Sequence, residues 1–138
     1  PCAYWAVENA KKKLLDQDFK PLLLKENWNL EKKGKYFLDI NGSTLIAFIM
    51  GENKMIENGF KIAVSHTDSP TFKIKPDPII IQNNYAKLNT EMYGGAILNT
   101  WLDRPLSLAG RILLKSDDLF NPISKLIYFD EALLYIPN

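Results

Sequence analysis

Residues 35–50 read KYFLDINGSTLIAFIM, and this stretch decides the fold of the N-terminal half of the chain. Two runs rich in β-branched and aromatic residues, Lys35 to Ile40 and Ser43 to Met50, flank the dipeptide Asn41–Gly42. Asn and Gly both tolerate the positive φ that a two-residue type I′ turn requires. The pattern therefore predicts a β-hairpin that turns at Asn41–Gly42.

The sequence before this hairpin has a helical period. Apolar residues recur at steps of three and four, with lysines and acidic residues between them. We expect a helix from about Ala3 to Gln17, and then a packed connector around Pro21 that covers the edge of the sheet. The apolar residues of the predicted helix are Tyr4, Val7, Ala10, Leu14 and Leu15.

A further strand is expected from Phe60 to Ser65. Its continuous apolar centre is typical of a strand that is buried on both faces in the middle of an α/β sheet. The only histidine of the chain, His66, follows directly, and Asp68 comes two residues later. Since ligands of open α/β sheets bind at the carboxyl ends of strands, these two residues are the first candidates for a functional site.

Side-chain alternation along the strand defines what His66 and Asp68 can do. In an extended chain they share one face, whereas Ser65 and Thr67 point to the other. A carboxylate in that position can orient an imidazole that holds a metal ion. The same alternation separates Ser65 from His66 and argues against a serine nucleophile with a histidine base. A lone histidine at a strand end also fits an ordinary polar pair, so the spacing alone leaves both interpretations open.

From Phe72 onward the helical period is absent, and short strands follow one another. Turn-forming residues separate these strands, among them Asn83–Asn84 and Gly94–Gly95. The change from mixed α/β to consecutive strands predicts a domain boundary near residue 75, between residues 1–75 and 76–138. The expected strands are Phe72–Lys75, Pro78–Gln82, Ala86–Met92, Leu106–Lys115, Ser124–Phe129 and Leu133–Ile136.

Composition excludes several classes of protein. Hydrophobic residues make up 46% of the 138 residues and charged ones 24%, which is typical of a folded protein and not of a disordered one. A net charge of +1, with glutamates beside the lysine clusters, predicts no nucleic-acid partner. The longest apolar run, Leu45 to Met50, is far shorter than the ~20 residues of a membrane span. The single cysteine, Cys2, favours a reducing compartment, so we expect a soluble, cytoplasmic protein.

Other polar features have structural interpretations. The acidic pairs Asp117–Asp118 and Asp130–Glu131 are expected to be solvated residues beside turns. The glycines of the Gly94 to Arg104 block match no phosphate-binding motif, and Asp103 with Arg104 fits either a structural ion pair or a positioning clamp. The chain begins at Pro1 without a methionine and ends in apolar sequence, so we expect it to be part of a longer protein.

Taken together, these motifs resemble the aspartyl aminopeptidase family of dizinc metalloaminopeptidases. The short His-x-Asp element is common to many zinc peptidases, but the similar segments follow the family's order over nearly the whole chain. They are the hairpin residues Gly34 to Phe37 and Asn41 to Phe48, Ser65 to Pro70 with Lys73, Lys75 and Pro76, Glu91 with Tyr93 to Gly95, Thr100 to Arg104, Leu108 to Arg111, and Ile136–Pro137.

The resemblance implies an enzyme that removes N-terminal residues from peptides with two zinc ions per subunit. It implies the α/β start of a zinc-peptidase catalytic domain, followed by the first part of an inserted, mainly antiparallel β dimerisation domain. Such domains pair subunits, and the dimers build dodecamers. His66 would be a zinc ligand and Asp68 the catalytic acidic residue that orients it.

The same resemblance places the remaining metal ligands and the general base beyond the point that matches Asn138. A histidine that reaches a neighbouring subunit's site would also lie just past this point. We therefore expect the chain to be inactive alone. The alternative is a self-contained β-rich assembly or binding module, in which His66 and Asp68 form a polar pair without metal chemistry.

Overall fold

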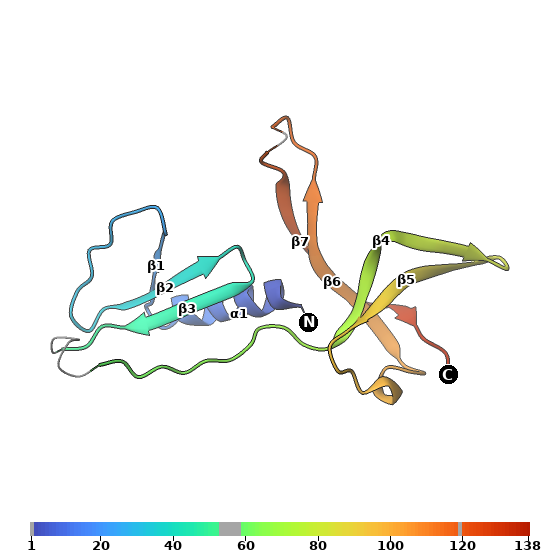
Figure 1. Ribbon diagram of the computed structural model, residues 1–138, viewed down its shortest axis with the longest axis horizontal. Coiled ribbons are helices and arrows are strands. Elements are labelled where there is room, and N and C mark those ends of the chain that lie inside the picture. The colour runs from blue at the N-terminus through green and yellow to red at the C-terminus, as the bar shows by residue number, and fades with distance from the viewer. Residues whose placement is uncertain (1, 53–58, 119) are drawn as a thin grey trace. The chain divides into compact units, whose positions relative to one another are not determined.

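The computed structural model describes residues 2–52, 59–118 and 120–138 (Figure 1). The chain divides into two compact units. Unit 1 comprises Pro1–Asp68 with Ala109–Tyr128, and unit 2 comprises Ser69–Leu108 with Phe129–Asn138. The described residues form mainly antiparallel sheets and one α-helix. No helix in these residues is long and apolar enough to cross a membrane.

Helix α1 spans Ala3–Leu15, which confirms the predicted helix and shortens it by two residues. The helix ends because Asp18 adopts a left-handed backbone with φ of 63°. The N–H of Phe19 then donates to the carbonyl of Leu14 at 3.0 Å, which satisfies one of the free carbonyls of the last turn. Val7 is the buried residue of the helix and is only 1% exposed.

The predicted hairpin is confirmed, but residues 41–43 connect its strands where the sequence predicted a two-residue turn. Strand β2 (Lys35–Ile40) pairs antiparallel with β3 (Thr44–Ile49), and Ile40 lies opposite Thr44. Asn41 and Gly42 have φ of 57° and 73°, the two left-handed residues of the expected turn. The centre of β2 forms the core of unit 1, since Tyr36, Phe37 and Leu38 are each 3% exposed.

The connector after the helix forms a short strand, β1 (Lys20–Leu22), which pairs parallel to β2. The sheet order is β1-β2-β3, so β1 lies at an edge. Proline is tolerated there because an edge strand leaves some N–H groups unpaired. The sequence therefore predicted the place of this segment at the sheet edge and missed its strand conformation.

The prediction of a buried strand from Phe60 to Ser65 is wrong for this structure. The segment is not a strand, and Phe60, Ile62 and Val64 are 75%, 79% and 89% exposed. A strand in the middle of a sheet needs a hydrogen-bonded neighbour on each side. Among the described residues, no backbone hydrogen bond joins residues 60–65 to the β1-β2-β3 sheet.

In unit 2, strand β4 (Thr71–Gln82) pairs antiparallel with β5 (Tyr85–Tyr93) around a two-residue turn. The turn residues Asn83 and Asn84 have φ of 50° and 63°. The two strands predicted within β4 are one strand, with a register shift between Ile74 and Ile79. Pro76 and Pro78 lie in this interval, and because proline has no N–H, it interrupts the ladder there.

A 3-10 helix, η1 (Leu98–Thr100), follows β5, and Trp101 packs edge-on against Phe72. The strands β6 (Pro105–Leu114) and β7 (Ile123–Tyr135) form a two-stranded sheet. The two strands predicted from Ser124 onward are one, and Asp130–Glu131 lies within it and not beside a turn. Asp118 is a turn residue as predicted, and its hydrogen bonds from Asn121 and Phe120 lower its pKa.

Asp103 and Arg104 do not pair with each other. The carboxylate of Asp103 accepts hydrogen bonds from the Tyr135 hydroxyl at 2.9 Å and from the Asn138 N–H at 3.1 Å. Arg104 donates to the carbonyl of Thr100 at 3.2 Å. Asp103 thus fastens the end of β7 to the turn before β6. Its hydrogen bond with the Tyr135 hydroxyl raises the pKa of Tyr135.

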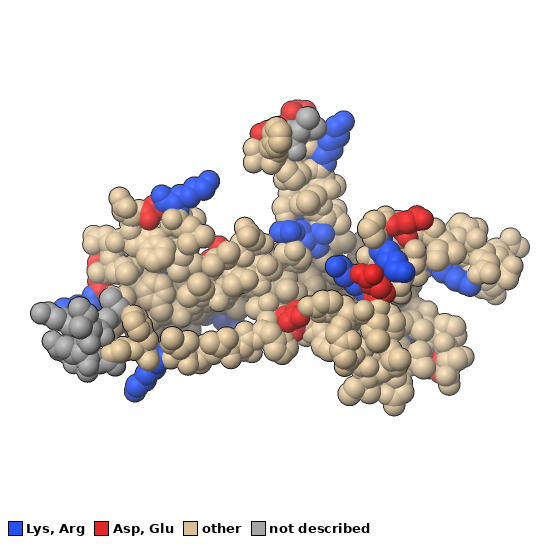
Figure 2. Space-filling view, viewed as in Figure 1, with Lys and Arg blue, Asp and Glu red and all other residues tan. Residues whose placement is uncertain are grey.

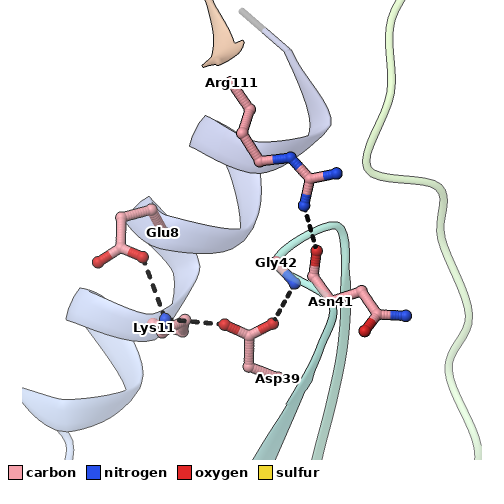
Figure 3. A network of polar contacts seen from close by, with 6 residues as sticks. All are labelled: Glu8, Lys11, Asp39, Asn41, Gly42 and Arg111. Carbon is pink, nitrogen blue, oxygen red and sulfur yellow. Dashed lines mark hydrogen bonds and ion pairs between the residues drawn. The ribbon is translucent and has the colours of Figure 1, made fainter. Parts of the chain in front are cut away.

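Figure 2 shows separate basic and acidic side chains among mostly uncharged residues on the face in view. In unit 1, one ion pair ties α1 to the hairpin, because Lys11 Nζ lies 2.8 Å from Asp39 Oδ2 and 3.1 Å from Glu8 Oε2 (Figure 3). Its hydrogen bond with Asp39 raises the pKa of Lys11, against a smaller opposing effect of burial.

Replacing Lys11 by Met should lower the free energy of unfolding by about 1 kcal/mol near pH 7, because this removes the ion pair and keeps a good helix former. Lys12→Met is the matched control, since Lys12 is exposed and has no ion-pair partner among the described residues. Because the Lys11 pKa is raised, the stabilisation is complete below its ordinary value of 10.5 and is lost as the pH rises above it. Chemical denaturation across this pH range measures the free energies of unfolding of Lys11→Met and Lys12→Met. If Lys11→Met is still the less stable variant in strong alkali, the result would contradict the ion pair.

Candidate metal-binding site

His66 and Asp68 lie together on one side of an extended segment. The Nδ1 atom of His66 is 2.8 Å from the Asp68 carbonyl oxygen and 3.1 Å from the carboxylate Oδ1. Both partners are acceptors, so Nδ1 carries the proton in the neutral ring and donates to them. The lone pair then resides on Nε2. The side chain of His66 is 78% exposed and that of Asp68 43%, so the ring is accessible.

This tautomer is the one that metal coordination through Nε2 requires. A histidine that ligates zinc usually donates its other ring N–H to a carboxylate or a backbone carbonyl. Here Asp68 provides both acceptors. The predicted pairing of His66 with Asp68 on one face is therefore present in the structure, and the donor set fits zinc.

Thr67 points away from this pair, as the alternation predicts. Its hydroxyl donates to the carbonyl of Ser43, in the β2–β3 turn, at 2.9 Å. Ser65 Oγ contacts the carbonyl of His66 at 3.5 Å and not the imidazole. No sequence pattern predicts the Thr67 bond, because its acceptor is a main-chain carbonyl, which every residue carries.

The described residues do not by themselves form a metal site. Among them, no group of three or more His, Cys, Asp or Glu side chains is arranged to hold a metal ion. A catalytic zinc commonly has three protein ligands and a water. Unit 1 provides one imidazole and the carboxylate that orients it, which is fewer ligands than such a site has. The acidic residues Asp117, Asp118, Asp130 and Glu131 are not gathered around it in any such group.

The whole chain matches a known family. Residues 1–138 match the family model described as aminopeptidase I zinc metalloprotease (M18). The chain therefore belongs to the M18 family, which confirms the resemblance drawn from its motifs.

Individual relatives agree with this assignment. The chain is 48% identical over 139 residues to the probable M18 family aminopeptidase 2 of Clostridium novyi, covering 100% of this chain and 32% of the relative. It is 38% identical over 136 residues to aspartyl aminopeptidase 4 of Saccharomyces cerevisiae, covering 97% of this chain and 28% of that protein. The chain thus spans about a third of the length of these relatives.

A solved structure gives the same result. The chain superposes on the Saccharomyces cerevisiae mApe1 dodecamer structure with a TM-score of 0.86 and 33% identity. This match covers 100% of the present chain and 33% of that one. The fold described above is therefore that of an M18 aminopeptidase segment.

The tautomer of His66 can be measured without any metal. The ring nitrogens should report the Nδ1–H form above the pH at which the imidazole loses its proton, since Asp68 accepts that hydrogen. Asp68→Ala should shift the ring towards the Nε2–H form, and only partly, because the residue 68 carbonyl remains. ¹⁵N chemical shifts check this cleanly, because the chain has one histidine.

Asp117→Ala is the control for this experiment, because Asp117 lies in the loop between β6 and β7 and does not contact the ring. It should leave the shifts unchanged. A wild-type chain in which the Nε2–H form predominates would contradict the assignment of the metal-binding nitrogen.

Proposed function

We propose that this chain is the N-terminal portion of a zinc-dependent aminopeptidase, which hydrolyses N-terminal residues from peptides. The observation that supports this most directly is the Nδ1–H of His66 on Asp68, which leaves Nε2 available to a metal in a chain of the M18 family. The relatives are named as aminopeptidases, and the family model is described as a zinc metalloprotease.

His66 would bind zinc through Nε2. Asp68 would hold the imidazole in that orientation and stabilise the positive charge that the ring gains on binding the metal. When bound, zinc lowers the pKa of a coordinated water towards neutrality and polarises a peptide carbonyl. Following the resemblance, we propose two zinc ions per subunit in the complete enzyme.

The remaining ligands would come from sequence outside these 138 residues. One imidazole is fewer than the three ligands of a typical catalytic zinc, so the chain alone should be inactive. In the complete protein, residues 60–65 would find the neighbouring strands that they lack here. Residues 1–75 would belong to the catalytic domain, and residues 76–138 would begin the β-rich dimerisation domain. The alternative of a self-contained binding module has no observation in its favour.

We also propose that the complete protein is a homo-oligomer, built from dimers into a dodecamer. The related Saccharomyces cerevisiae structure is a dodecamer. In unit 2, the far end of the β4–β5 hairpin exposes Ile79, Ile81 and Tyr85 at 60%, 71% and 70%. A cluster of exposed apolar side chains of this kind is typical of a surface that another protein covers.

The zinc ligand can be tested in the complete protein. His66→Ala should reduce peptide turnover by about 100-fold or more and lower the zinc content per subunit, because a directly bound ligand matters at least as much as the residues that orient it. Zinc would be measured by elemental analysis, and turnover with peptides that carry acidic or apolar N-terminal residues.

Asp117→Ala should behave as the wild type in both measurements. Turnover and zinc content of His66→Ala near the wild-type values would refute the role proposed for His66. Wild-type protein that contains no zinc and cleaves none of these peptides would refute the proposed function itself.

A further inference from the structure

We propose that Thr67 is a positioning residue that fixes His66 and Asp68 by anchoring their segment to the β2–β3 turn. This inference rests on the proposed function of His66 as a zinc ligand. Thr67 contacts no metal and no reacting group. Its side chain lies on the opposite face of the segment from the two residues that it holds, so it acts on them through the main chain.

The Thr67 hydroxyl attaches the segment to the rest of unit 1. Among the described residues, the Thr67 hydroxyl makes the only hydrogen bond that joins residues 60–67 to another part of unit 1. The apolar side chains of Phe60, Ile62 and Val64 are largely exposed and fix no position. Thr67 itself is half-buried against the turn. The 2.9 Å bond to the Ser43 carbonyl is therefore a point at which the segment is attached to the turn.

The acceptor lies in a well-fixed turn. Asp39 Oδ1 accepts the N–H of Gly42 at 2.7 Å, and the N–H of Ser43 donates to the carbonyl of Ile40 at 3.4 Å. The two left-handed residues before Ser43 fix the direction of its carbonyl, because they leave the turn little conformational freedom.

Two longer-range contacts hold the same turn from outside the hairpin (Figure 3). Lys11 of helix α1 binds the second carboxylate oxygen of Asp39 at 2.8 Å. Arg111 donates to the carbonyl of Asn41 at 3.2 Å. Its guanidinium carbon lies 4.1 Å from the centre of the Tyr4 ring. Helix α1 thus braces the turn on which Thr67 depends.

Metal ligands need positions that are held to within about 0.5 Å. Loss of the Thr67 hydroxyl would release the segment from the turn while keeping both candidate side chains intact. The expected result is an imidazole that still has the correct tautomer and spends less time in the binding position. Zinc affinity should therefore fall while the fold remains.

The test compares Thr67→Val with Thr67→Ser in the complete protein. Valine has the shape of threonine and lacks the hydroxyl, whereas serine keeps it. We expect Thr67→Val to weaken zinc binding about tenfold, the lower end of the effect of residues that orient metal ligands. Thr67→Ser should restore most of the affinity. Competition with a zinc chelator measures the dissociation constants, and thermal unfolding of the metal-free variants reports their stability.

Thr100→Val is the matched control. The Thr100 hydroxyl also donates to a main-chain carbonyl, that of Ile97 at 2.7 Å, but in unit 2. Its loss removes the same kind of bond and should leave zinc affinity unchanged. Positioning by Thr67 is supported if Thr67→Val binds zinc more weakly than Thr100→Val does. The two metal-free variants should then have similar stability.

Each failure has a distinct result. A wild-type protein that binds zinc, with Thr67→Val as tight as Thr100→Val, would overturn the positioning role and leave the proposed function intact. If Thr67→Val does not fold, Thr67→Ser decides, because a tenfold loss of affinity with the hydroxyl present would contradict the inference. A wild-type protein without zinc affinity would overturn the proposed function instead.

Discussion

The left-handed turn at Asn41–Gly42 is the constraint on which unit 1 depends. It reverses the chain between β2 and β3, and so sets the register that buries Tyr36, Phe37 and Leu38. Its peptide groups then receive side chains from distant parts of the sequence, including Arg111 and Thr67. This turn thus joins the core of the sheet to the segment that presents His66.

The candidate site pairs one imidazole with the groups that orient it. Asp68 selects the tautomer of His66, and Thr67 attaches the segment to a braced turn. Asp68 and Thr67 would support His66 as a ligand, and neither would replace the other ligands that a catalytic zinc needs. This division fits a chain that belongs to a zinc metalloprotease family and spans about a third of its relatives.

Local patterns predicted the parts of the fold that depend on local sequence. The helical period found α1, and Asn41–Gly42 found the hairpin and its turn. The apolar run at residues 60–65 predicted a buried strand, and this was wrong because burial depends on neighbours that the described residues do not provide. Alternation placed His66 with Asp68, whereas the Thr67 anchor was missed because a carbonyl acceptor has no sequence signal.

A zinc-bound crystal structure of the complete protein, with anomalous diffraction recorded at the zinc absorption edge, would locate the metal relative to His66. We expect zinc on Nε2 of His66 at about 2.0–2.1 Å, with Nδ1 still facing Asp68. Zinc bound through Nδ1, or bound only away from His66, would contradict this expectation.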